Sequence, residues 1–172
     1  MKEISVPSPA SNSLKSIVWG GLLGGLGDFL FAFVFYGWKI RVFQSVAAGL
    51  IGRDAAFAGG VPTFLFGVGL HFLIGIIWAA LFWGLSRRVP ALVKHAIPAG
   101  LAWGAVVFYG MNCVVLPLSA LHTKAWPPPW PWVAPWPLAA HLLVVGLPIS
   151  LVAKRYALPK DEGRSKGLEV SG

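Results

Sequence analysis

Residues 17–37 read IVWGGLLGGLGDFLFAFVFYG, a run in which Asp28 is the one charged side chain. A helix rises ~1.5 Å per residue and the hydrocarbon core of a bilayer is ~30 Å thick, so ~20 apolar residues are enough to cross it. Basic residues flank the run, at Lys15 on one side and at Lys39 and Arg41 on the other. The run is too long for the apolar part of a signal peptide. It predicts a retained transmembrane helix.

Three further apolar runs follow, at 62–85, 96–118 and 136–153. Of the 172 residues, 56% are hydrophobic and 12% are charged. Soluble domains are about 45–50% apolar and about 25% charged. The sequence therefore predicts an all-α polytopic membrane protein, a four-helix transmembrane bundle formed by residues 17–153. The polar segments 1–16 and 154–172 are expected to be tails, the second of them disordered.

Two connections between the spans are distinctive. Residues 40–60 place Val42, Val46, Leu50 and Ile51 at helical spacing, which predicts a short interfacial helix that lies on the membrane or dips into it. Residues 123–137 read TKAWPPPWPWVAPWP, where dense proline favours an extended path and Trp favours the headgroup level. This segment has two interpretations, an aromatic anchor at the interface or a lid over a cavity.

The distribution of Lys and Arg predicts the orientation. With four spans, the two termini and the loop between spans two and three share one side. Ten of the fourteen basic residues lie there: Lys2, Lys15, Arg87, Arg88, Lys94, Lys154, Arg155, Lys160, Arg164 and Lys166. The positive-inside rule places both termini in the cytoplasm, in a bacterial inner membrane. The basic residues follow the apolar runs and form no stripe interleaved with aromatics, so the net charge of +8 does not indicate nucleic-acid binding.

Each span contains one polar residue that lipid does not favour: Asp28, His71, Asn112 and His141. Counting ~1.5 Å per residue from the non-cytoplasmic end of each span puts them ~13, ~13, ~9 and ~8 Å deep. An alternating bundle would bring these four groups into one layer of its outer half. An ionisable group costs ~2.5–3.5 kcal/mol at the centre of a membrane helix, so such groups usually face the interior of a bundle and mark a site.

Three chemical interpretations of this layer are open. It is a proton or ion relay, because a carboxylate and two imidazoles exchange protons readily. Alternatively, Asp28, His71 and His141 bind a divalent metal, or the two histidines ligate haem, although we expect no cofactor. In the third interpretation, hydrogen bonds among these residues only hold the helices together, at ~0.6 kcal/mol each. Gln44 and His122 are further candidate contributors.

Glycine pairs in the first span predict close helix packing. Gly20 with Gly24, and Gly21 with Gly25, form two overlapping small-xxx-small motifs that let another backbone approach. The partner is either a neighbouring span or a second copy in a homo-oligomer. The sequence contains no nucleophile elbow, no HExxH and no phosphate-binding loop, which favours a protein without enzymatic activity.

The second half of the chain resembles the YagU-like small inner-membrane proteins of bacteria, whose function is unassigned. The similar stretches are HFLIGIIWAALFWGL from His71, PLSAL at 117–121, and the Trp/Pro segment that leads into AHLLVV around His141. The resemblance implies a multi-spanning inner-membrane protein and supplies no catalytic residues.

The leading functional hypothesis is a small transporter or ion- or proton-translocating protein that uses the polar layer. The first alternative is a structural, assembly or envelope-stress component of the membrane without transport. The second is a haem- or metal-binding membrane protein.

Overall fold

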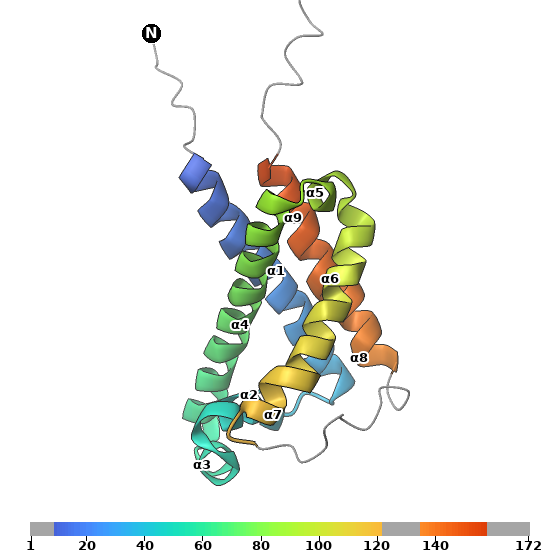
Figure 1. The fold of residues 1–172 in the computed structure, drawn as a ribbon. Helices are drawn as coiled ribbons and strands as arrows, with labels where there is room; N and C mark the ends of the chain where they lie inside the picture. The colour runs from blue at the N-terminus through green and yellow to red at the C-terminus, as the bar shows by residue number, and fades with distance from the viewer. Residues whose placement is uncertain (1–8, 122–134, 158–172) are drawn as a thin grey trace, which may run out of the picture.

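The structure, a computed structural model, describes residues 9–121 and 135–157 (Figure 1). Within these ranges every regular element is helical, which confirms the all-α prediction. The elements in chain order are α1 (Pro9–Phe35), α2 (Arg41–Ile51), α3 (Arg53–Ala58), α4 (Gly60–Arg88), α5 (Ala91–Lys94), α6 (Ala96–Gly110), the π-helical segment η1 (Met111–Val115), α7 (Leu116–Leu118), α8 (Pro135–Ala140), the π-helical segment η3 (His141–Gly146) and α9 (Leu147–Ala157).

Four continuous helical stretches are long and apolar enough to cross a membrane, so the chain is a multi-pass membrane protein. They are Asn12–Phe35, Gly60–Arg88, Ala96–Leu118 and Pro135–Ala157. The third has the bounds predicted from sequence, and the others extend beyond the prediction at their basic ends. The prediction ended each span where the apolar run ends. Lys and Arg are good helix formers and are favourable in the last turn of a helix, so a helix can continue past the apolar run.

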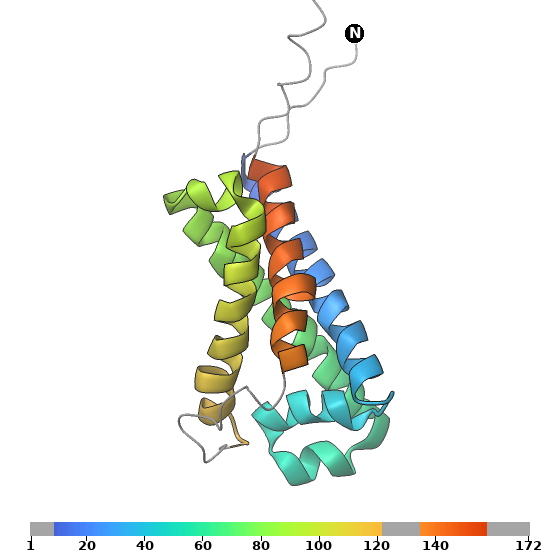
Figure 2. The same ribbon diagram turned by 90° about the vertical axis from the view of Figure 1, so that its right-hand side faces the viewer.

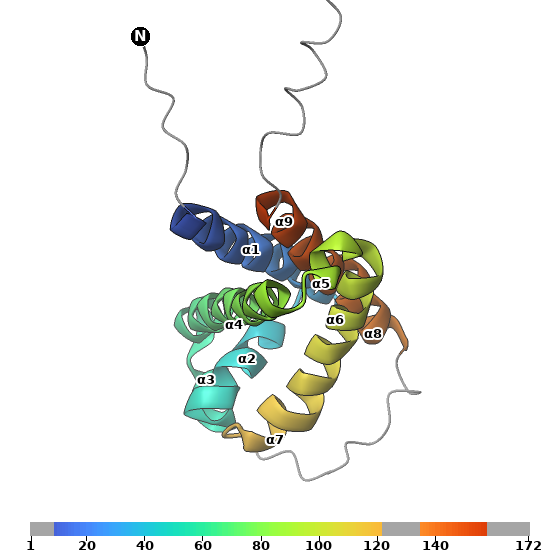
Figure 3. The same cartoon turned by 45° about the horizontal axis from the view of Figure 1, so that its top comes forward.

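The first and last described residues lie at the same end of the bundle, here called the terminal end, and α2 and α3 lie at the opposite loop end (Figures 1 and 2). Helix α1 packs between α4 on one side and α9 with η3 on the other, and α6 packs on α9 and η3. In Figure 3, α4 lies beside α1 and α6 lies beside α9. Between α4 and α6, Trp103 of α6 contacts the rings of Trp78 and Phe82 of α4.

Glycine allows these close approaches. A methyl group on Gly21 would lie 2.5 Å from Cα of Ile76 in α4, and one on Gly24 would lie 3.1 Å from the Val145 carbonyl oxygen in η3. A methyl group on Gly25 would lie 3.0 Å from the ring of Phe72 in α4, and one on Gly20 would be in ordinary contact with Ala79 of α4 and Ile149 of α9. All four glycines are buried by helices of their own chain, so each of them contacts a neighbouring span.

The connection between the first two spans forms two helices instead of one. Helix α2 crosses the first two turns of α4, where Gly67 lies directly against the backbone of Phe43. Its buried face consists of Phe43, Gln44, Ala47 and Ala48, while Leu50 and Ile51 are exposed. The apolar face predicted from sequence is therefore rotated: Phe43, Gln44 and the two alanines pack inward, and Leu50 and Ile51 point out.

Both π-helical segments end two residues before a proline, η1 before Pro117 and η3 before Pro148. Proline lacks the N–H that the carbonyl four residues upstream would bond, and its ring presses on that carbonyl. A wider π turn relieves this conflict, and such turns are frequent at functional sites. Asn112 lies in η1 and His141 in η3, so two members of the predicted polar layer occupy irregular turns.

The terminal half of the bundle contains an apolar core. Phe82 and Ile149 are almost fully buried there, and they pack with Ala79, Trp83, Val107, Val145 and Ala153. The buried hydroxyl groups of Ser86 and Ser150 donate hydrogen bonds to carbonyls three residues upstream in their own helices. These two hydroxyls are therefore satisfied within their own helices, while the buried Nε1 of Trp103, packed against the same core, has no hydrogen-bond partner among the described residues.

Candidate functional site

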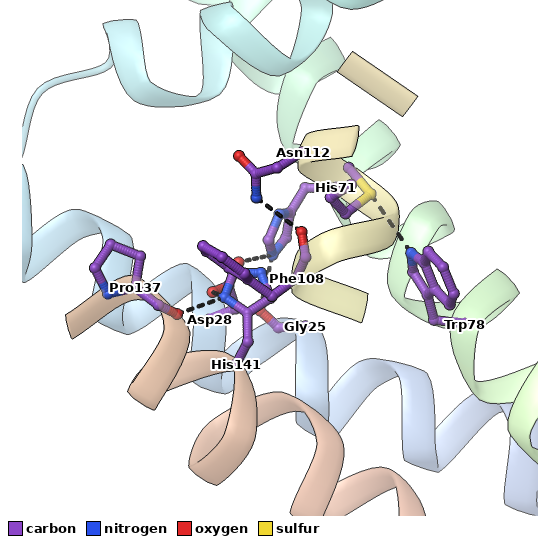
Figure 4. A network of polar contacts seen from close by, with 9 residues as sticks. Gly25, Asp28, His71, Trp78, Phe108, Asn112, Pro137 and His141 are labelled. Atoms are coloured by element: carbon purple, nitrogen blue, oxygen red, sulfur yellow. Dashed lines mark hydrogen bonds and ion pairs between the residues drawn. The ribbon is translucent and has the colours of Figure 1, made fainter. Parts of the chain in front are cut away.

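Three of the four predicted polar-layer residues meet at one point in the bundle. The Asp28 carboxylate of α1 lies between two imidazoles: Oδ2 is 4.0 Å from Nε2 of His71 in α4, and Oδ1 is 3.9 Å from Nδ1 of His141 in η3 (Figure 4). Three different helical segments thus converge on one carboxylate. The side chains are partly accessible, with 21%, 14% and 19% of the surface of Asp28, His71 and His141 exposed.

Backbone carbonyls hold both imidazoles. Nε2 of His71 lies 2.9 Å from the Gly25 carbonyl oxygen of α1, and Nδ1 of His141 lies 2.7 Å from the Pro137 carbonyl oxygen one turn upstream. A carbonyl oxygen only accepts hydrogen bonds, so in each case the ring nitrogen must carry the hydrogen. The two nitrogens nearest Asp28 are therefore both N–H donors. In the neutral rings, the lone pairs are on Nδ1 of His71 and Nε2 of His141.

Local sequence explains why these groups reach one another. Gly25 lacks a side chain and lies beside Phe72, so α1 and α4 approach closely enough for His71 to reach a carbonyl of the neighbouring helix. On the other side of α1, a methyl group on Gly27 would lie 2.6 Å from the Val144 carbonyl oxygen. This is the carbonyl that Pro148 cannot bond within its own helix. The glycines before Asp28 therefore bring both histidine-bearing segments toward the carboxylate.

A cavity of about 90 Å³ adjoins the three side chains. Its wall includes Gly24 and Gly75, on the apposed faces of α1 and α4, and Val46 of α2. Trp78 and Met111 close the side between α4 and η1, where the indole N–H donates to the Met111 sulfur at 3.5 Å. Pockets for organic ligands typically measure about 300–1,000 Å³. This cavity is sized for water molecules or a small ion.

Asn112 is placed elsewhere. Its side-chain amide donates to the Phe108 carbonyl oxygen of its own helix at 2.8 Å, and the residue is not part of the cavity wall. Asparagine and serine-like side chains often bond backward to a carbonyl one turn upstream. The structure therefore gives Asn112 a local partner and does not bring it to Asp28.

Gln44 belongs to a second polar cluster at the loop end. Its side chain is 2% exposed, and Nε2 donates to the Gly60 carbonyl at 2.9 Å and to Oγ1 of Thr63 at 3.2 Å. The Thr63 hydroxyl in turn bonds the Ala56 carbonyl of α3 at 2.6 Å. These contacts fix α2 and α3 on the start of α4 and do not reach the cavity. His122 lies outside the described residues, as does most of the Trp/Pro segment predicted as anchor or lid.

Most wall residues of the cavity were not among the sequence-predicted site residues, and Val46, Trp78 and Met111 are examples. The helical pattern of residues 40–60 contains Val46 but gives no sign that α2 would cover a cavity. Trp78 and Met111 look like ordinary apolar residues of a span. Their role depends on the relative rotation of α4 and α6, which is a tertiary property.

The triad as arranged does not fit a metal or a haem. A metal between Asp28 and the two imidazoles would need lone pairs on His71 Nε2 and His141 Nδ1, and both atoms are engaged as N–H donors to carbonyls. In the described ranges, no three His, Cys, Asp or Glu side chains form a group that could hold a metal ion. Axial haem ligation through Nε2 of His71 would likewise need a lone pair on an atom that donates to the Gly25 carbonyl.

Comparison of the chain with protein families, with characterised proteins and with solved structures finds no match.

Proposed function

We propose that the protein translocates protons or another small monovalent cation across the membrane, with Asp28 as the central group and His71 and His141 as its exchange partners. The observation that supports this is the carboxylate bracketed at 4.0 and 3.9 Å by imidazoles from two other helical segments, beside a cavity in a membrane-spanning bundle. Ionisable groups in such positions are costly and typical of ion pathways.

The geometry suggests how a proton would pass. A proton that binds the lone pair on His141 Nε2 makes the ring an imidazolium, and the Nδ1 proton then moves to Oδ1 of Asp28. The His71 ring can deliver a proton to Oδ2 in the same way. The transfer from His141 releases its Nδ1–H from the Pro137 carbonyl and leaves Nδ1 without hydrogen. Nε2 of His71 still carries its hydrogen, so Asp28 can pass the proton on to His71 only after that ring has exchanged tautomer or turned, which breaks its bond to the Gly25 carbonyl. The bonds to these two carbonyls thus belong to the resting state.

Orientation and location belong to this proposal. The terminal end presents Lys15, Arg87, Arg88, Lys94 and Arg155 as exposed basic side chains, and by the positive-inside rule it faces the cytoplasm. The site then lies in the outer half of an inner-membrane protein, with α2 on its outer side. We also propose that the chain is a YagU-like protein, on the basis of the second half of its sequence. This membership assigns no role to any residue.

The test is flux through the full-length protein in liposomes that contain a pH-sensitive dye, with an imposed membrane potential as driving force. We expect Asp28→Asn to reduce proton entry to the level of protein-free vesicles. Asn112→Ala is the matched control, because it removes a polar group of similar depth that is bonded within its own helix. Equal flux in the wild type and in Asp28→Asn would overturn the proposal.

The rival proposal is a structural membrane component whose polar groups only specify helix packing. It predicts wild-type vesicles no more permeable than empty ones, together with a large loss of thermal stability in Asp28→Asn. The two proposals therefore differ in both measurements.

A further inference from the structure

Among the residues that the structure describes, Asp28 is the one acidic side chain in the wall of the cavity. None of the described Lys or Arg side chains contributes to its wall, and with neutral imidazoles the site carries one unit of charge from Asp28. In a low-dielectric interior an unpaired charge is strongly unfavourable, and the most favourable occupant is the one that cancels it. A monovalent cation does so, whereas a divalent ion would leave one positive charge in its place.

Hydrogen-bonding capacity narrows the class of cation. Asp28, His71, Trp78 and His141 are the polar side chains in the cavity wall. The facing N–H groups of both histidines are bonded to carbonyls, and the Trp78 N–H is bonded to the Met111 sulfur. What these side chains still offer are acceptors: two carboxylate oxygens, Nδ1 of His71 and Nε2 of His141. A complementary occupant must donate hydrogen bonds.

Size and ligand type also separate the candidates. Potassium sites in proteins are built from rings of oxygen atoms, largely backbone carbonyls. Of the described side chains, Asp28 is the one that supplies oxygen to this wall, and the Gly25 carbonyl beside it is already bonded to His71. Imidazole nitrogens are good hydrogen-bond acceptors and poor alkali-metal ligands. The cavity of about 90 Å³ is several times the ~10–15 Å³ that one water molecule needs by the same measure, so an ammonium group with one small substituent fits.

From the carboxylate without a Lys or Arg in the same wall, the surplus of acceptors and the volume, we propose that this site binds ammonium and the smallest primary ammonium ions, such as methylammonium, in preference to sodium, potassium and divalent metals. The inference rests on the proposed function, because it names the cation that the same site would pass. It adds a selectivity that proton translocation alone does not require. Ammonium and potassium ions have nearly equal radii and equal charge, so a preference between them must come from hydrogen bonds.

Binding is tested first, without any transport. The melting temperature of the full-length protein in detergent is compared in ammonium, methylammonium, potassium and sodium chloride at equal concentration. Binding to the folded state stabilises it, and near saturation we expect a rise of roughly 2–4 °C in the two ammonium salts over potassium. Asp28→Asn should lose this difference and Asp28→Glu should keep it; if Asp28→Asn does not fold, the wild type and Asp28→Glu decide. Equal melting temperatures in ammonium and potassium salts would overturn the inference.

Transport is tested by charge movement in proteoliposomes on a solid-supported membrane, because neutral ammonia crosses bilayers and carries no current. A jump to ammonium or methylammonium chloride should give a current several times that of the same jump to potassium chloride, with Asn112→Ala as the control. Proton currents with no ammonium preference would overturn this inference and leave the proposed function standing. Ammonium-specific stabilisation with no current of any ion would uphold the binding site and overturn translocation.

Discussion

The two halves of the bundle differ in what fills the space between their helices. The terminal half is filled with apolar side chains around Phe82 and Ile149, and its buried hydroxyls bond within their own helices. The loop-end half contains the Asp28 triad, a cavity, two π-helical segments and a helix that covers them. One half is regular and closed, and the other combines irregular helix with polar groups that bond between helices.

The difference teaches where stability and function reside. Close packing through glycine and aromatic side chains occurs along α1 and through the terminal half, so that part should dominate the free energy of unfolding. The Asp28–imidazole distances of 3.9 and 4.0 Å are too long for strong hydrogen bonds, so the triad should add little stability. The role that we propose for it is ion movement. Four substitutions test this contrast.

The largest effect is expected for Gly21→Val. A methyl group at this position would already lie 2.5 Å from Cα of Ile76, and the obstacle is backbone that cannot rotate away. Overpacking typically costs about 1–3 kcal/mol and more where nothing can move, so we expect a loss at the upper end or failure to fold. Gly84→Ala is the control, since nothing lies within 4 Å of its added methyl group. Thermal unfolding in detergent measures both, and similar losses for the two variants would show that α1 and α4 do not pack here.

Gln44→Leu should have the next largest effect on stability. The substitution removes the hydrogen bonds to Gly60 and Thr63 and leaves a buried carbonyl and hydroxyl with fewer partners, at a cost of about 1–2 kcal/mol. The effect should be local, with faster hydrogen exchange or proteolysis in α2 and α3 and little change in α9. Uniform destabilisation of all helices would contradict the separation of this cluster from the core.

Asp28→Asn should change stability by less than about 1 kcal/mol while it abolishes ion flux. The amide keeps the size of the carboxylate and removes the charge and the proton-accepting oxygen. Unfolding and flux are measured on the same preparation. If the variant lost several kcal/mol of stability and kept its flux per folded molecule, the triad would be a stabilising contact and not part of an ion pathway.

The smallest effect is expected for Asn112→Ala. Its amide bonds a carbonyl four residues upstream in its own helix, and loss of such a bond in a membrane helix costs ~0.6 kcal/mol on average. Flux should equal that of the wild type. A loss of flux comparable to that of Asp28→Asn would place Asn112 in the pathway in spite of its local hydrogen bond.

Much of this architecture was predictable from sequence alone. The hydropathy of about 20 consecutive residues predicts a span without knowledge of the neighbouring helices. The third span has the predicted bounds. Depth counting along the helices put Asp28, His71 and His141 in one layer, because helix rise is nearly constant. It could not give their rotation about the helix axis. Asn112 was predicted in the same layer, and in the structure its side chain bonds a carbonyl of its own helix.

The sequence by itself determined that the chain crosses a membrane with four helices and that polar residues lie inside them, because both follow from composition along one helix at a time. Only the tertiary structure decided that the glycines of α1 face α4 and α9, that Gln44 holds α2 and α3 on α4, and that Val46, Trp78 and Met111 enclose the cavity. These depend on which helix faces fit against each other. Gly25 and Gly27 allow α4 and η3 to approach α1 from two sides, and that approach brings both imidazoles to Asp28.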